Sequence, residues 1–139
     1  MARSFKKKKQ SVKIQNSNYP IPPSNQTITG KPIFSFIYLQ SNYCISLCTK
    51  EQKVGFTDTM RILSSLSWQQ INSSNRHLHG KEIISRDSLK VPIPATIAED
   101  ENIIAIRFHD NAPMVGVRRN DVFHIFWFDR NFTVYNHGN

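Results

Sequence analysis

Glycine and cysteine are scarce in this sequence, and their scarcity argues against several enzyme classes. Only 5 of the 139 residues are glycine, and no glycine-rich loop is present that could hold the phosphates of a nucleotide cofactor. The two cysteines, Cys44 and Cys48, are four residues apart. That spacing is neither a redox CxxC nor half of a zinc site. We interpret both as packed thiols of a reducing cytoplasm, and we expect neither a small-molecule cofactor nor a metal.

Long apolar runs and N-terminal acids are missing as well. No run of about 18 apolar residues occurs, which predicts that nothing crosses a membrane, and the basic run at residues 6–9 precedes polar sequence, which argues against a secretory signal. The first acid is Glu51. Of the 18 Lys and Arg residues, seven lie in residues 1–32, so residues 33–139 carry eleven bases against ten acids. The basic charge therefore belongs to the N-terminal segment.

Residues 1–31 are predicted to form a basic flexible arm, and residues 32–139 a single domain. Four consecutive lysines in the arm favour a polyanion such as RNA or the ribosome as partner. A solvated tail without a partner would have the same composition. These four residues are Lys6, Lys7, Lys8 and Lys9.

The last third of the domain predicts an antiparallel meander. Its apolar segments are separated by Asp110-Asn111 and Asn120-Asp121, and Asn and Asp favour two-residue hairpin turns because they tolerate left-handed backbone angles. The expected strands are residues 103–109, 112–119 and 122–129, and residues 32–39 are expected to add an earlier strand.

The turns set registers that divide the meander into two faces. They place Val117 opposite His124, and Val115 opposite both Ile106 and Phe126. One face would be an apolar core carrying Ile104, Ile106, Phe108, Val115, Val117, Phe126 and Phe128, with His124 as a structural histidine at its edge. The other would be a mixed, open face carrying Arg107, His109, Met114, Gly116, Arg118, Ile125, Trp127 and Asp129. We interpret the open face as the functional one, although a one-residue slip would exchange the faces of a strand.

Two capping boxes predict the helices. Thr49 with Gln52 precedes a helical stripe of apolar residues that begins at Phe56. This helix would start at Thr49 or only near Phe56, because a glycine lies between them. Ser67 with Gln70 predicts a short second helix. The expected fold class is thus α+β: an N-terminal strand, one or two helices, then a three- to four-stranded antiparallel meander.

Residues 72–102 yield no firm element. They could be a functional loop, a mobile loop or elements that the pattern conceals. Residues 76–82, RHLHGKE, mix imidazole and basic groups more densely than any other segment. His77 and His79 could ligate a metal only with a third ligand, and none is evident.

Arginine, histidine and tyrosine are the residue types that remain for chemistry. This set suits metal-free phosphodiester chemistry, since Arg binds phosphate oxygens and His moves protons near neutral pH. The catalytic candidates are Arg107, Arg130, Tyr135, His137, His77 and His79. The candidates for nucleic-acid binding are Arg76, Lys81, Arg118, Arg119 and Trp127, together with the four arm lysines. Structural alternatives stay open: an Arg107–Asp129 ion pair, a solvated tip at Arg118 and Arg119, and packing of Trp127.

The order of strand, helices and meander, closing on a base and an aromatic, resembles the RelE/ParE/HigB toxin superfamily of type II toxin–antitoxin systems, in its ParE-like or HigB-like branch. Residues 34–39, 56–71 and 103–137 carry the similarity. Arg107 matches an arginine on a middle strand of that family, and Arg130 and Tyr135 match its closing base and aromatic. Residues 72–102 and the long arm depart from the pattern.

The resemblance implies a cytoplasmic toxin that cleaves mRNA without a metal, often on the ribosome, by activating the 2′-hydroxyl. It also implies a cognate antitoxin as protein partner. Two alternatives stay open: a toxin that inhibits DNA gyrase, as other members do, and a non-enzymatic module of the same fold that binds nucleic acid or protein.

Overall fold

The computed structural model describes residues 30–137. The arm candidates Lys6, Lys7, Lys8 and Lys9 therefore lie outside the described residues. The elements are β1 (Ile33–Ser35), α1 (Lys50–Ser64), α2 (Trp68–Ser73), β2 (Lys81–Ile84), β3 (Ile103–His109), β4 (Ala112–Arg119) and β5 (Val122–Phe128), with 3-10 turns at Ser41–Tyr43, Ile45–Leu47 and Arg86–Ser88. The α+β class is as expected.

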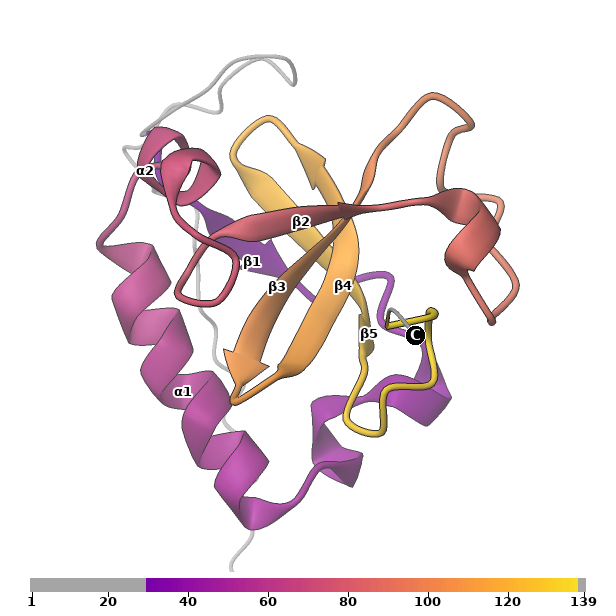
Figure 1. The fold of residues 1–139 in the computed structure, drawn as a ribbon, viewed down its shortest axis with the longest axis horizontal. Helices are drawn as coiled ribbons and strands as arrows, with labels where there is room; N and C mark the ends of the chain where they lie inside the picture. The colour runs from indigo at the N-terminus through magenta and orange to yellow at the C-terminus, as the bar shows by residue number, and fades with distance from the viewer. Residues whose placement is uncertain (1–29, 138–139) are drawn as a thin grey trace, which may run out of the picture.

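Five strands form one sheet in the order β1-β5-β4-β3-β2 (Figure 1). The strand β1 runs parallel to β5, and all other neighbours are antiparallel. The three central strands β3, β4 and β5 fall where the sequence predicts them. Both hairpin turns contain a residue with positive φ, Asp110 at 50° and Asn120 at 57°, which Asp and Asn accommodate better than most residues. The local chemistry of the turns therefore predicts the strand ends.

The registers differ from the prediction because both hairpins contain a bulge. Val117 lies opposite His124 as predicted, but the pairing then shifts, so that Val115 lies opposite Trp127 instead of Phe126. Gly116 permits the shift, because a Cβ on this residue would collide with the carbonyl oxygen of His124. A second irregularity next to His109 places Val115 opposite Ala105 instead of Ile106. The extra residues exchange the faces of the side chains beyond each bulge.

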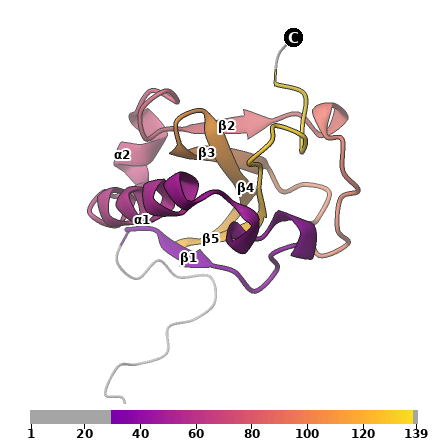
Figure 2. The same cartoon turned by 90° about the horizontal axis from the view of Figure 1, so that it is seen from below.

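Both faces of the sheet are covered, which corrects the prediction of one open face. The helices α1 and α2 cover the first, as Figures 1 and 2 show; we call it the helix-covered face. Its core consists of Cys48, Leu63, Trp68, Ile71, Ile104, Ile106, Phe108, Ala112, Met114, Phe123, Ile125 and Phe128. The other is the tail-covered face, whose core consists of Ile84, Ile97, Ile103, Ala105, Val115, Val117, Phe126, Trp127, Val134 and Tyr135. The predicted core residues Val115, Val117 and Phe126 thus lie on the opposite face from Ile104, Ile106 and Phe108.

Both predicted capping boxes are present. The backbone N–H of Thr49 donates to Gln52 Oε1 at 2.9 Å, and that of Gln52 donates to Thr49 Oγ1 at 3.1 Å. The helix α1 begins directly afterwards, so of the two predicted starts the one at Thr49 is confirmed and the alternative near Phe56 is not. The intervening Gly55 has a packing role, because the ring of His109 occupies the space that a Cβ would need. In residues 30–137, no helix has the length and apolar character to cross a membrane.

Residues 72–102 contain elements that the periodicity concealed. The strand β2 pairs with β3 at the edge of the sheet. The following segment pairs with the closing tail: the Lys90 N–H donates to the Val134 carbonyl at 2.8 Å, and the Asn136 N–H donates to the Ser88 carbonyl at 2.8 Å. The earlier strand, expected over residues 32–39, is confined to β1. These pairings bring the segment that follows β2 against the last residues of the chain.

Candidate functional site

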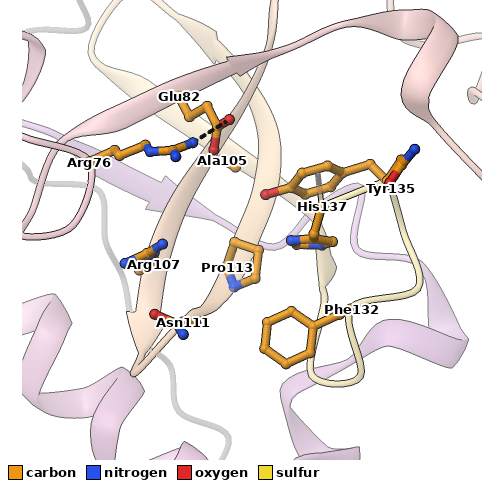
Figure 3. Close-up of a pocket in the computed structure, with 10 residues that line it drawn as sticks. Arg76, Glu82, Ala105, Arg107, Asn111, Pro113, Phe132, Tyr135 and His137 are labelled. Atoms are coloured by element: carbon orange, nitrogen blue, oxygen red, sulfur yellow. Dashed lines mark hydrogen bonds and ion pairs between the residues drawn. The ribbon is translucent and has the colours of Figure 1, made fainter. Parts of the chain in front are cut away.

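A hollow of about 350 Å³ lies at one end of the tail-covered face, between β3, β4, residues 76–82 and the closing tail (Figure 3). Ala105, Arg107 and Pro113 come from the two central strands. The full lining is Arg76, Glu82, Ala105, Arg107, Asn111, Pro113, Phe132, Tyr135, Asn136 and His137. Four of these, Arg76, Arg107, Tyr135 and His137, are residues that the sequence nominates for function.

A buried carboxylate orients His137. Asp129 follows β5 and is fully buried. Its Oδ1 accepts the backbone N–H groups of Thr133 at 2.7 Å and Val134 at 3.2 Å, and its Oδ2 lies 2.9 Å from His137 Nε2. A carboxylate in this place favours the tautomer with the proton on Nε2. The Nδ1 atom is then unprotonated, and within residues 30–137 it makes no hydrogen bond.

Tyr135 lies against the same imidazole. The two rings are stacked, with centroids 3.8 Å apart and planes inclined by 25°. The backbone of Tyr135 bridges to Leu89, which fixes the ring beside the sheet. Burial raises the pKa of the Tyr135 phenol, and the nearby carboxylate of Glu82 adds to this effect. The phenol therefore keeps its proton near neutral pH and can donate a hydrogen bond.

Two guanidinium groups lie across the hollow from this pair of rings. Figure 3 shows the Tyr135 hydroxyl directed towards the side on which Arg107 lies. The Arg107 Nη1 atom is 2.9 Å from His77 Nδ1; because the guanidinium can only donate, this imidazole nitrogen is the acceptor. Arg76 forms an ion pair with Glu82 at 2.8 Å. One guanidinium is thus compensated by a carboxylate, and the other contacts an imidazole nitrogen.

Two candidates are placed away from the hollow. Arg130 donates from Nη1 to the carbonyl of Asn42 at 3.1 Å and does not line the hollow. Trp127 is only 2% exposed and packs against Phe126 in the core of the tail-covered face. Its packing interpretation therefore holds, and its ring is not available in the hollow to stack a base.

The arginine pair at the β4–β5 turn has structural contacts. The Arg118 guanidinium lies 4.3 Å from the centroid of the Trp68 ring, a cation–π contact. Arg119 forms a bidentate pair with Glu101, with N–O distances of 2.7 and 2.9 Å, and this hydrogen bonding lowers the pKa of the Glu101 carboxyl. Neither arginine lines the hollow. Both side chains make contacts with other residues, so they are more than a solvated tip.

Further predicted residues lie elsewhere. His79 is half-buried in the turn before β2, and Lys81 lies in β2 opposite Ile106; both are outside the hollow. The structural role predicted for His124 agrees with its ring contact to Tyr38 at 5.2 Å. Within residues 30–137, no three His, Cys, Asp or Glu side chains gather in a possible metal site.

Three residues at or beside the hollow were not predicted in the role that the structure gives them. Asp129 was considered as a partner of Arg107, whereas the structure pairs it with His137. Glu82 and Phe132 were not nominated for the site. The spacing Asp129-x7-His137 is the sequence signal for the pair of Asp129 and His137. This spacing brings the two side chains together only when the tail turns back along the sheet.

Compared with protein-family models, curated proteins and solved structures, the chain matches none. The geometry of the hollow is therefore the basis on which we infer a function.

Proposed function

We propose that the chain is a metal-independent endoribonuclease whose active site is the hollow between Arg107 and His137. The observation that carries the proposal is the His137 imidazole, which is oriented by the buried Asp129 and faces a guanidinium across the same cavity. A carboxylate–imidazole pair is an arrangement that enzymes use to prepare a general base. A guanidinium supplies the bidentate grip on a phosphate that such a base needs beside it.

In this mechanism, His137 Nδ1 removes the proton of an RNA 2′-hydroxyl. The 2′-oxygen attacks the adjacent phosphorus, and the bond from phosphorus to the 5′-oxygen breaks. The products are a 2′,3′-cyclic phosphate and a 5′-hydroxyl end. The leaving oxygen takes a proton from solvent water, and the imidazolium returns its proton to solvent, so the balance closes without a metal. Asp129 stabilises the imidazolium by accepting the hydrogen bond from Nε2–H and keeps its negative charge throughout.

Arg107 and Tyr135 would act on the phosphate itself. The attack builds negative charge on the two non-bridging oxygens, and preorganised donors lower the barrier for such a step. Arg107 can offer a bidentate pair of N–H groups once the phosphate displaces His77 as its acceptor. Because its pKa is raised, Tyr135 serves as a neutral hydrogen-bond donor and not as the acid that protonates the leaving group.

The biological setting that we propose follows the resemblance to the RelE/ParE/HigB superfamily: a toxin that cleaves mRNA, free or on the ribosome, and is held inactive by an antitoxin. Expression of the wild-type chain should then arrest growth. The basic arm would add affinity for RNA, because a four-lysine run neutralises phosphates and releases counterions.

The decisive experiment is cleavage of labelled RNA by the purified full chain in EDTA. We expect products with 2′,3′-cyclic phosphate and 5′-hydroxyl ends, and a loss of about a hundredfold or more in His137→Ala and of about tenfold or more in Arg107→Ala. Arg61→Ala, an exposed arginine on the last turn of α1, is the matched control and should cleave normally. Salt-dependent RNA binding without any cleavage would instead identify a non-enzymatic module.

A further inference from the structure

Phe132 has a backbone conformation that is unusual for its residue type. Its φ is 59°, in the left-handed region that glycine and asparagine tolerate and bulky residues avoid. Its side chain is nevertheless 43% exposed, so burial does not account for a phenyl ring here. Backbone strain of this kind concentrates at functional sites.

The ring borders two hollows. Besides the one described above, a second hollow of about 280 Å³ is lined by Thr49, Gln52, His109, Asp110, Asn111, Ala112 and Phe132. Phe132 and Asn111 line both, so the two hollows adjoin at these residues. The Phe132 ring meets the His137 ring edge to face, with centroids 5.1 Å apart and planes at 88°, below the Tyr135–His137 stack in Figure 3. The ring therefore lies next to the proposed general base and at the boundary of both cavities.

The two hollows differ in chemistry. The first contains two guanidinium groups, of which Arg76 is paired with Glu82 and Arg107 is available to a phosphate. The second is lined by amide, hydroxyl, imidazole and carboxylate groups, and no Lys or Arg of residues 30–137 lines it. The Asn111 side chain forms no hydrogen bond within residues 30–137, so its amide has a donor and an acceptor available. Such groups suit the polar edge of a nucleobase, which carries both donors and acceptors.

We propose that Phe132 stacks a nucleobase whose polar edge enters the second hollow, beside a phosphate held in the first. The ligand is therefore single-stranded RNA, because a base inside a duplex is stacked on its neighbours and cannot reach the ring. This inference rests on the proposed function: it adds a base subsite to the site where His137 and Arg107 act. The strained backbone at Phe132 is the conformation that presents the ring at this boundary.

The test compares two ligands with one backbone. A dodecamer of 2′-O-methyl adenosine cannot be cleaved, and its abasic counterpart has the same phosphates without bases. We expect the wild-type chain to bind the adenosine dodecamer about tenfold more tightly. In Phe132→Asn this preference should disappear while affinity for the abasic chain is retained, and Phe132→Trp should keep the preference. Thermal melting should show Phe132→Asn as stable as wild type or more so, because asparagine tolerates the positive φ.

Cleavage by the wild type and base preference in the variant can fail independently. If the wild type cleaves RNA and Phe132→Asn still prefers the adenosine dodecamer, stacking by Phe132 is refuted and the proposed function stands. If the wild type binds a duplex and a single strand equally well, stacking by Phe132 is refuted as well. If the wild type neither binds nor cleaves RNA, both proposals fail together. Should Phe132→Asn unfold, Phe132→Gly provides the same comparison, because glycine has no side chain to strain at this φ.

Discussion

The two faces of the central sheet differ in how they are covered. On the helix-covered face, Leu63, Ile71 and Met114 are fully buried, and aromatic rings meet edge to face, as Phe108 and Phe128 do at 5.2 Å. The tail-covered face has its own apolar core, but at one end the Tyr135 phenol and the His137 imidazole border the hollow, and the buried Asp129 holds this imidazole from behind. A helix can seal a sheet face completely, whereas a narrow tail seals only part of it.

The tail itself is held by a small set of backbone contacts. Asp129 accepts the N–H groups of Thr133 and Val134, and hydrogen bonds of 2.8 Å join Lys90 to Val134 and Ser88 to Asn136.

Substitutions on the helix-covered face should therefore act on stability, and substitutions around the hollow should act on activity. Four changes test this division, from the largest expected effect to the smallest.

His137→Gln should have the largest effect. The glutamine amide can still donate to Asp129, but it cannot take a proton, so the cleavage rate should fall by about 10²–10⁴-fold, or roughly 3–5 kcal/mol of transition-state stabilisation. The free energy of unfolding should change by less than about 1 kcal/mol, because the glutamine keeps the hydrogen bond to the buried Asp129. Single-turnover cleavage and urea denaturation measure the two quantities. Unchanged cleavage would remove His137 from the mechanism.

Leu63→Ala should produce the converse result. This side chain is fully buried between α1 and the sheet, so its truncation should lower the free energy of unfolding by about 2–5 kcal/mol. Cleavage per folded molecule should stay normal, because the hollow lies on the other face. Chemical denaturation and active-site titration with a tight-binding RNA analogue check both parts. If fully folded Leu63→Ala protein lost much of its cleavage activity, packing on the helix-covered face would have to influence the hollow on the other face.

Thr49→Ala should have a smaller effect on stability. It removes the hydroxyl that accepts the Gln52 N–H at the start of α1, and the loss of an N-cap costs about 1 kcal/mol. Thr57→Ala is the matched control, since its hydroxyl bonds within the helix to the Lys53 carbonyl and caps no terminus. Equal melting temperatures for Thr49→Ala and wild type would contradict the assignment of the cap.

The smallest effect is a pH dependence from His124. Burial lowers the pKa of this imidazole, and the positive charge of Arg119 lowers it further. The folded state thus binds a proton less readily than the unfolded state, so stability is fully present above about pH 6.5, the ordinary histidine pKa, and falls as the pH drops towards the lower folded pKa. In His124→Gln, denaturation midpoints should fall less between pH 7 and pH 5. An identical decline in both proteins would exclude His124 as the source.

Elements defined by neighbouring residues could be predicted, and elements defined by distant ones could not. The strands β3, β4 and β5 and the caps at Thr49 and Ser67 depend on contacts within a few residues. The predicted pairing of β4 with β5 holds near the turn, at Val117 and His124, but fails beyond Gly116, because the bulge there forms only when the His124 carbonyl approaches it. The strand β2 was missed because four residues carry too little periodicity, and its pairing with β3 is non-local.

Sequence alone thus determined where the chain turns and where its helices begin, since Asp110, Asn120 and Thr49 act through their own backbone neighbourhood. It also nominated Arg107 and His137 by residue type. Only the tertiary structure decided that these two side chains share a hollow and that Asp129 orients the imidazole. The physical reason is range: hydrogen bonds in turns and caps act within a few residues, whereas a site is assembled when the chain folds its tail across a sheet.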